Sequence, residues 1–310
     1  MSKQRYRYAN MGGVERMNTL GDMLQWRKER KAKRKDLSFV VPQAPSEEIE
    51  RMLAAGDEPT VTWIGHSTFL MRLGGLWIAT DPVWAESMGF MKRLAAPGVP
   101  LEKLPPIDVV LISHGHYDHL DFPTLRRIRA KGQPLVLVPH GLAGKMRRKG
   151  FSRVQELAWW EDMQEGSVTF TFVPAQHWTR RTPWDTNSSH WGGWVLRDGS
   201  RTVYFAGDSG YFGGFAQIGA KYKPDYVLMP IGAYEPEWFM KLQHVSPEEA
   251  VQAFVDTGGH YMIPMHYGAF RLADDTPKEA LNRLYTEWGR RLLDPDRLLE
   301  PVHGGTVWLK

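Results

Sequence analysis

The chain has 310 residues, a formal net charge of +4 at pH 7, 42% apolar residues and 24% charged residues. This composition is ordinary for a soluble globular protein, and no apolar run is long enough to cross a bilayer. The sequence contains no cysteine, which excludes disulfides and thiolate chemistry, so a bound metal would need His, Asp or Glu ligands.

The first 59 residues are a polar, basic extension that we expect to pack on or flank a single domain formed by residues 60–310. Residues 1–36 carry eleven Lys or Arg against four Asp or Glu, while residues 37–310 are slightly acidic, with 28 against 31. Most of the excess lies in RKERKAKRK, residues 27–35. This segment could lie on anionic lipid, or it could be a solvated helix face. We expect a cytoplasmic protein, with peripheral contact at the inner membrane face as one option, because the chain starts without an apolar signal.

The predicted elements alternate between strands and helices. TVTWIGHSTFLMRL, residues 60–73, is predicted as one strand that turns at Gly74-Gly75 into a second, and residues 107–113 as a short buried strand. Further strands are predicted at residues 134–139, 167–175, 191–198, 201–208 and 226–232, and helices at residues 122–132, 246–259 and 277–293. Two successive strand-rich halves with interspersed helices predict an α+β sandwich of two facing mixed sheets with helices outside.

The strand at residues 107–113 is followed at once by HGHYDHLD, which packs three histidines and two aspartates into eight residues. Side chains alternate along an extended segment, so His114 and His116 can share one metal ion. Asp118 and His119, past the turn, can face a second ion. Two ions about 3.5–4 Å apart need a bridging ligand to offset their repulsion, so the remaining ligands must come from other segments.

Three further donors follow apolar strands: His177, Asp208 and His266. Any one of them alone could be a capping residue or a hydrogen-bonded surface residue. Together they indicate a polar cluster at one edge of the sandwich, because a core would exclude such groups.

These motifs resemble the metallo-β-lactamase superfamily, whose fold is an αββα sandwich with its metals at one sheet edge. SHGHYDHLD, PAQHWTRRTPWD, FAGDSGY and MHYGAF resemble, within it, the branch of N-acylphosphatidylethanolamine-hydrolysing phospholipase D. The likeness covers about residues 60–270 and is far weaker in the basic amino-terminal region. It also separates the chain from the flavo-diiron oxidoreductases of the superfamily, which carry a glutamate where this chain has His116.

The resemblance implies two divalent metal ions, Zn²⁺ by preference and Mn²⁺ or Fe²⁺ as alternatives. It assigns His114, His116 and His177 to one ion. It assigns Asp118, His119 and His266 to the other, with Asp208 as the bridge.

Other residues around these motifs are candidates for supporting roles. Asp81 could orient a ligating imidazole, or it could form an Asp-Pro turn. Asp121 is interpreted as the N-cap of the following helix rather than as a supporting carboxylate. His66, Tyr117 and His244 could contact substrate oxygens, and the resemblance puts Tyr117 and His244 near the phosphate. No chemistry is assigned to His140, His190, His260 and His303, which we interpret as surface or turn residues.

The hypothesis is hydrolysis of a phosphodiester, in which metal ions lower the pKa of water to about 7 and so supply hydroxide. Asp118, Asp208 and His244 are the catalytic candidates. The resemblance implies cleavage of an N-acylphosphatidylethanolamine-like phospholipid into N-acylethanolamine and phosphatidic acid. Alternatives are a lactonase of the ascorbate-6-phosphate type, a small-molecule phosphodiesterase, and a lipid-surface binding protein with structural metals.

The apolar stretches at residues 84–94 and 236–241 could line an acyl-chain groove, or they could serve in core packing. A nuclease is disfavoured, because the acidic body argues against a long basic groove for nucleic acid. The sequence is compatible with an oligomer as well as with a monomer.

Overall fold

The computed structural model describes residues 8–13 and 18–310. One sheet contains β1 (Thr60–Gly65), β2 (Thr68–Leu73), β3 (Leu76–Thr80), β6 (Val109–Leu111), β7 (Leu135–Pro139), β8 (Val154–Leu157) and β15 (Thr306–Trp308). The other contains β9 (Asp162–Glu165), β10 (Val168–Val173), β11 (Gly193–Arg197), β12 (Thr202–Phe205), β13 (Tyr226–Pro230) and β14 (Tyr261–Met265). A separate small hairpin pairs β4 (Ser87–Met88) with β5 (Met91–Lys92).

The α-helices of the described residues are α1 (Leu20–Ala32), α2 (Ser46–Leu53), α3 (Phe122–Lys131), α4 (Ala143–Arg148), α5 (Gly214–Tyr222), α6 (Glu237–Met240), α7 (Pro247–Thr257) and α8 (Pro277–Arg290). Short 3₁₀ turns occupy Met11–Gly13, Leu101–Lys103 and Pro295–Arg297. None of these helices has the length and hydropathy needed to cross a bilayer.

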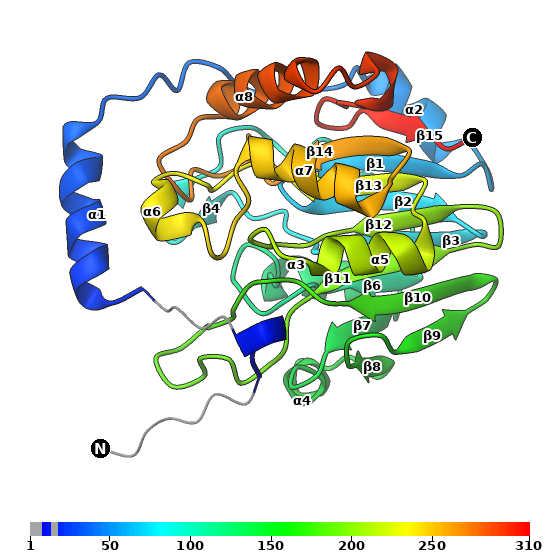
Figure 1. Ribbon diagram of the computed structural model, residues 1–310. Coiled ribbons are helices and arrows are strands. Elements are labelled where there is room, and N and C mark those ends of the chain that lie inside the picture. The colour runs from blue at the N-terminus through cyan, green and yellow to red at the C-terminus, as the bar shows by residue number, and fades with distance from the viewer. Residues whose placement is uncertain (1–7, 14–17) are drawn as a thin grey trace.

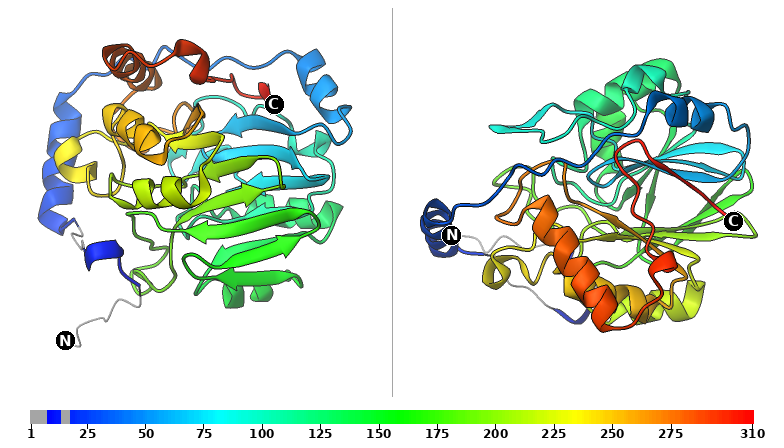
Figure 2. Two further views of the ribbon diagram at one scale, coloured as in Figure 1. Left: turned by 45° about the vertical axis from the view of Figure 1, so that its right-hand side comes forward. Right: turned by 90° about the horizontal axis from the view of Figure 1, so that it is seen from above.

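The two sheets face each other and the helices lie on their outer sides (Figures 1 and 2). The strand orders are β15-β1-β2-β3-β6-β7-β8 and β14-β13-β12-β11-β10-β9, each with parallel and antiparallel pairs. Helices α2, α3 and α4 pack on the first sheet, and α5, α7 and α8 cover the second. The predicted α+β sandwich of two mixed sheets is therefore confirmed.

Large aromatic side chains from both sheets fill the space between them. Trp63 and Phe69 of the first sheet and Phe172, Trp194 and Tyr204 of the second are all fully buried in one core cluster. Burial of each such side chain contributes roughly 1.5–3 kcal/mol. A rigid core of this kind holds the strand ends of both sheets in fixed relative positions.

Local signals in the sequence mark the starts of the three predicted helices correctly. Asp121 accepts a hydrogen bond from the Thr124 amide, so its interpretation as the N-cap of α3 is confirmed. Ser246 and Glu249 form the capping box predicted for α7, and Gly258, with φ of 62°, ends that helix. Helices α2, α5 and α6 were not predicted, and α1 includes part of the basic segment for which a solvated helix face was one interpretation.

The single strand predicted over residues 60–73 is wrong. The chain reverses between β1 and β2, where Gly65 and His66 adopt φ values of 123° and 57°. Both strands are buried along nearly their whole length, so the apolar pattern continues through the turn without a break. The turn between β1 and β2 contains no Asn-Gly or Asp-Gly pair, so the sequence does not mark it as a hairpin turn.

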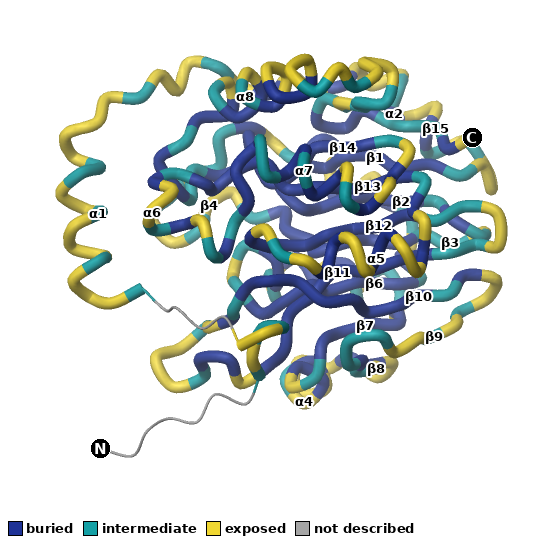
Figure 3. The backbone as a smooth tube through the Cα atoms, viewed as in Figure 1, coloured by how far each residue is buried: buried dark blue, intermediate teal, exposed yellow. Residues whose placement is uncertain are grey.

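The amino-terminal extension touches the body in two different ways. Helix α2 buries Ile49 and Met52 in the core on the outer side of the first sheet. Helix α1 has no buried residue and stands at the side of the body (Figures 1 and 3). The Trp26 indole nitrogen donates to the buried carboxylate of Asp274 at 2.9 Å. The domain boundary at residues 59 and 60 stays a prediction.

Candidate metal centre

The predicted site residues lie where strands of both sheets end. Strands β3 and β6 are parallel, and β10 points the same way as β12 because each is antiparallel to β11. The ends of these strands therefore meet at one edge of the sandwich. Asp81 follows β3, His114 to His119 follow β6, His177 follows β10, Asp208 follows β12 and His266 follows β14.

Two groups of potential metal donors lie side by side at this edge. The first contains His114, His116 and His177, and the His116 Nδ1 atom is 2.9 Å from His114 Nε2 and 3.2 Å from His177 Nε2. The second contains Asp118, His119 and His266 together with His66.

Within the second group, Asp118 Oδ2 is 3.3 Å from His119 Nε2 and 3.7 Å from His266 Nε2. In both groups the donor atoms converge closely enough to share one cation. The structure thus brings together the same two sets of three that the resemblance implies.

Asp208 lies between the two groups. Its Oδ1 is 3.1 Å from His266 Nε2, and its Oδ2 is 3.1 Å from His119 Nε2 and 3.9 Å from both His114 Nε2 and His177 Nε2. The preceding Gly207 has φ of 63°, and a Cβ there would come within 2.9 Å of the Ser113 side chain. This close passage against the opposite sheet lets one carboxylate reach both donor groups.

Several buried donor atoms of the site have no well-aligned hydrogen bond to a described residue, although three of them lie in pairs 3.1 Å from an oppositely charged group. They are His119 Nε2, Asp208 Oδ1, His244 Nδ1, His66 Nδ1 and both ring nitrogens of His266. Unpaired buried polar atoms are costly and rare in folded proteins. Divalent cations coordinated by imidazole nitrogen and carboxylate oxygen would satisfy atoms of this kind, so the residues present fit a metal centre.

Burial and mutual electrostatics set the protonation of the first donor group and of the carboxylates. Burial holds the pKa of His114 and His177 well below the usual range and lowers that of His116 to about 4. Burial opposes ionisation of Asp118 and Asp208, but the neighbouring imidazoles, His119 first among them, hold both pKa values well below normal. Neutral imidazoles and ionised carboxylates are the forms that bind metal.

Two histidines of the second group behave differently. Burial disfavours a charged His119, but the carboxylates of Asp208, Asp118 and Asp81 outweigh it and raise the His119 pKa well above normal. Burial also opposes protonation of His266, yet Asp208 and Asp118 raise its pKa to about 9. Without a metal both imidazoles therefore hold protons that a cation would displace.

Asp81 lies directly behind the second donor group. Its Oδ2 is 2.7 Å from His119 Nδ1, and its two oxygens accept hydrogen bonds from the amide and hydroxyl of Ser113. The Ser113 hydroxyl is also 2.9 Å from His114 Nδ1. Contacts of this kind orient imidazoles by way of the nitrogen that does not face the metal.

Left-handed backbone recurs among these residues. Asp81, His66 and His266 have φ values of 33°, 57° and 64°, three of the eight positive values outside glycine in the described chain. Such conformations cost about 1–3 kcal/mol each and concentrate at functional sites, where the surrounding structure holds them.

The three candidates for substrate contact occupy different positions. Tyr117 is exposed and its hydroxyl donates to the Arg181 carbonyl at 2.9 Å. His244 is half-buried, with Nδ1 3.9 Å from Asp208 Oδ2, and burial lowers its pKa to about 4. His66 is buried, and its Nε2 lies 3.0 Å from Asp118 Oδ2. His66 thus faces a candidate ligand, whereas Tyr117 faces solvent.

A cleft of about 430 Å³ opens beside the donor groups. His116, Tyr117, Asp118 and Asp121 line its polar side, and its apolar side contains Ala85, Met88, Met91 and Leu272. The β4–β5 hairpin supplies both methionines and carries the fully exposed Phe90 at its tip.

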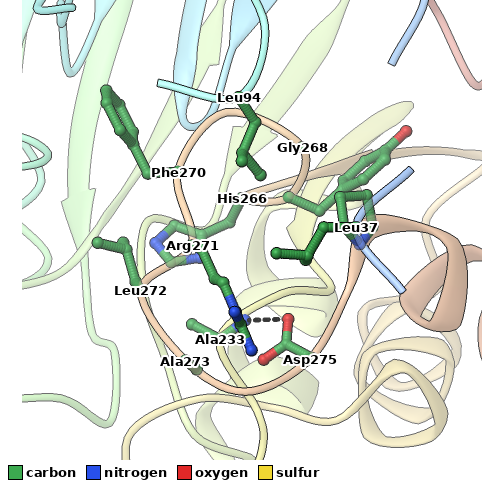
Figure 4. A pocket seen from close by; sticks show the side chains of 12 residues that line it. Leu37, Leu94, Ala233, His266, Gly268, Phe270, Arg271, Leu272, Ala273 and Asp275 are labelled. Atoms are coloured by element: carbon green, nitrogen blue, oxygen red, sulfur yellow. Dashed lines mark hydrogen bonds between the residues drawn. The ribbon is translucent and has the colours of Figure 1, made fainter. Parts of the chain in front are cut away.

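A second pocket, behind His266 and lined by Phe270, Arg271 and Leu272, has a volume of about 10 Å³ (Figure 4). That volume is enough for about one water molecule.

Sequence reasoning missed several groups around the site. Ser113 directly precedes the histidine motif, and its side chain could have been considered for that reason. The Gln243 carbonyl oxygen lies 2.9 Å from His177 Nδ1, and a backbone contact of this kind leaves no sequence signal. The interpretation of His190 and His303 as surface or turn residues is wrong, because both are buried among aromatic side chains.

The sandwich with a His and Asp cluster at one edge defines the class of protein. Residues 76–267 match the family described as "Beta-lactamase superfamily domain", so the chain belongs to that superfamily and has its fold. Solved structures support the fold: a metallo hydrolase from Ignicoccus hospitalis matches with a TM-score of 0.63 and 24% identity, over 81% of this chain and 98% of that one. An isothiocyanate hydrolase from Delia radicum gut bacteria matches with a TM-score of 0.67 and 19% identity, over 81% of this chain and 99% of that one.

Closer relatives are found by sequence. The N-acyl-phosphatidylethanolamine-hydrolyzing phospholipase D 1 of Caenorhabditis elegans is 39% identical over 226 residues, 67% of this chain and 64% of that protein. An uncharacterized protein of Mycobacterium tuberculosis is 39% identical over 235 residues, which are 72% of this chain and 62% of that protein. The chain thus spans a little under two thirds of the length of each of these two relatives. A metal-dependent hydrolase of Rubrobacter xylanophilus is 30% identical over 226 residues, 71% of this chain and 86% of that protein. The chain is therefore a member of a family of metal-dependent hydrolases.

Proposed function

We propose that the chain is a binuclear phosphodiesterase of phospholipase D type that acts on N-acylphosphatidylethanolamine-like lipids. The observation that carries the proposal is the position of Asp208, within 3.1 Å of one imidazole nitrogen on each of two residues and within 3.9 Å of both outer histidines. An apolar-walled cleft beside this cluster and the relatives in Caenorhabditis elegans and yeast named for this reaction support the choice of substrate.

In this proposal His114, His116 and His177 hold one divalent ion. Asp118, His119 and His266 hold the other, and Asp208 faces both. When bound, the ions lower the pKa of water to about 7 and polarise phosphoryl oxygens. The buried, ionised carboxylates keep the centre's charge low enough for two cations to lie close together.

The residues around the centre have separate tasks. Asp81 holds the ring of His119 by its Nδ1 atom, and His66 holds the carboxylate of Asp118. His244 is neutral at pH 7, because burial lowers its pKa to about 4. A neutral imidazole retains one N–H, with which His244 donates a hydrogen bond to a phosphate oxygen. Tyr117, at the cleft mouth, meets the headgroup side of the substrate.

The apolar wall of the cleft selects a lipid. Met88, Met91 and Leu272 line one side of a space that also contains Asp118, and flexible thioether side chains adapt well to alkyl chains. An acyl chain on this wall would bring the phosphate of the same lipid to the donor groups. The products are an N-acylethanolamine and phosphatidic acid.

Peripheral membrane contact belongs to the same proposal. Arg30, Lys33 and Lys35 pair with carboxylates of the body. The other basic side chains of the segment are exposed and form no ion pair with a described residue: Arg27, Lys28, Lys31 and Arg34. On an anionic surface each would contribute roughly 1 kcal/mol. The cytoplasmic location stays a prediction.

A substrate panel tests the proposal. Metal-replete and EDTA-treated protein are incubated with N-acylphosphatidylethanolamine in mixed micelles, with bis-p-nitrophenyl phosphate and with lactones, and the products are identified by mass spectrometry. We expect metal-dependent release of N-acylethanolamine and phosphatidic acid. Consumption of lactones alone would identify a lactonase instead, and binding of vesicles without any product would identify a lipid-binding protein.

A further inference from the structure

Arg181 contacts the backbone of the histidine motif from another loop. Its Nη1 atom lies 2.9 Å from the Gly115 carbonyl oxygen, 3.2 Å from that of His116 and 2.9 Å from that of Leu120. The three carbonyls bracket the turn that carries His116, Asp118 and His119. The Arg181 guanidinium therefore binds backbone oxygens at both ends of this turn.

The side chain of Arg181 is fixed in this position by further contacts. Its guanidinium lies 4.0 Å from the centre of the Tyr117 ring, and the Tyr117 hydroxyl donates back to the Arg181 carbonyl at 2.9 Å. The Arg181 amide donates to Asp185 Oδ1 at 2.8 Å. These reciprocal bonds lock the two loops together rather than leaving a mobile surface arginine.

The two loops supply ligands to the same donor group. His116 comes from the turn after β6, whereas His177 lies four residues before Arg181 in the loop after β10. No backbone pairing of β6 with β10 joins them, since these strands belong to different sheets. Arg181 connects the two loops through hydrogen bonds that its charged guanidinium donates.

We propose that Arg181 is a positioning residue that preassembles the metal centre by holding the His116–His119 turn against the His177 loop. The inference rests on the metal centre proposed above. Contacts that orient ligands from behind typically contribute a factor of about 10–100 to metal affinity. Arg181 lies within the PAQHWTRRTPWD stretch, but it acts through the backbone of the ligands, so its residue type gives no sign of a role in metal binding.

A purely structural arginine in the same chain provides a matched control. Arg297 donates to the carbonyls of His260 and Gly259 at 2.8 and 2.7 Å and lies 5.2 Å from the Phe254 ring. Its contacts resemble those of Arg181, but none of the residues involved belongs to a donor group. Loss of Arg297 should lower stability without changing the affinity for metal.

The experiment measures Zn²⁺ dissociation constants of the full-length chain by chelator competition at 25 °C, together with melting temperatures. We expect Arg181→Met to bind Zn²⁺ about 10–100-fold more weakly than wild type, Arg181→Lys to recover part of the loss, and Arg297→Met to bind as wild type. If Arg181→Met does not fold, Arg181→Lys and Tyr117→Phe, which loses only the hydroxyl bond, should each still weaken binding measurably.

Two results would overturn the inference while leaving the metal centre in place. One is wild-type affinity in the Arg181 variants, and the other is an equal loss in Arg297→Met. Wild-type protein that binds no Zn²⁺ would instead remove the proposed function itself, and the inference with it.

Discussion

Asp208→Asn is the most direct test of the binuclear centre. The amide has the shape of the carboxylate, so the core around this 3% exposed side chain should stay packed. The substitution removes a negative charge that reaches both donor groups, 3.1 Å from His119 Nε2 in the second and 3.9 Å from His114 Nε2 in the first.

A minimum size of the effect follows if a bound cation lies no farther from Asp208 than these imidazole nitrogens do. For unit charges 3.1 Å apart, Coulomb's law with an effective dielectric constant of about 20 gives about 5 kcal/mol. At about 1.4 kcal/mol per factor of ten, this corresponds to a loss of roughly 10³-fold or more in cation affinity. We expect the variant to retain at most one equivalent of metal and to lose turnover by at least that factor.

The assay combines metal content after gel filtration, circular dichroism and turnover of bis-p-nitrophenyl phosphate and N-acylphosphatidylethanolamine. Asp108→Asn is the control: Asp108 precedes β6, at the end away from the site, and accepts a hydrogen bond from the Trp77 amide that asparagine can also accept. Two equivalents of metal and wild-type rates in Asp208→Asn would refute a bridging role for this carboxylate.

Three further outcomes are expected. Because the His266 pKa is raised to about 9 in metal-free protein and the His119 pKa also lies well above normal, metal uptake at pH 7 should release about two protons, and affinity should rise with pH until about pH 9. Calorimetry in buffers of different ionisation enthalpy measures this, and an affinity that does not change between about pH 6 and pH 9 would contradict it. Asp81→Asn, which disturbs the 2.7 Å contact to His119 Nδ1, should weaken metal binding about 10–100-fold, as chelator competition would reveal, and unchanged affinity would argue against the orienting role. Phe90→Ser, at the exposed hairpin tip, should lower the rate on vesicle-borne lipid relative to bis-p-nitrophenyl phosphate by about tenfold; an unchanged ratio would exclude lipid contact at that tip.

Much of the architecture could be read from local patterns. The strands over residues 109–111, 135–139 and 226–230 are continuous apolar runs, and each of them is buried in the structure. The Ser246 capping box predicted the start of α7 because the side-chain hydrogen bonds involved span only three residues. Helix α5 lacks such a cap, since it begins at Gly213-Gly214 without a side-chain hydrogen bond, and it was missed.

The candidate site was predictable as a set of residue types but not as a geometry. Donor residues placed after apolar strands indicate a polar edge, because parallel strands deliver their ends to the same side of a sheet. The contacts of Arg181 were not predictable, since it acts through backbone carbonyls of another loop.

The amino-acid sequence by itself determined the main buried strands, the starts of α3, α7 and α8, and which side chains can ligate a metal. These properties depend on a few neighbouring residues and on the period of the apolar pattern. Only the tertiary structure decided that Asp208 reaches His119 and His266 at once, and that His66 faces Asp118 from a turn between two strands. Those distances depend on how two sheets pack through a common aromatic core, and packing between segments more than fifty residues apart leaves no periodic signal in either one.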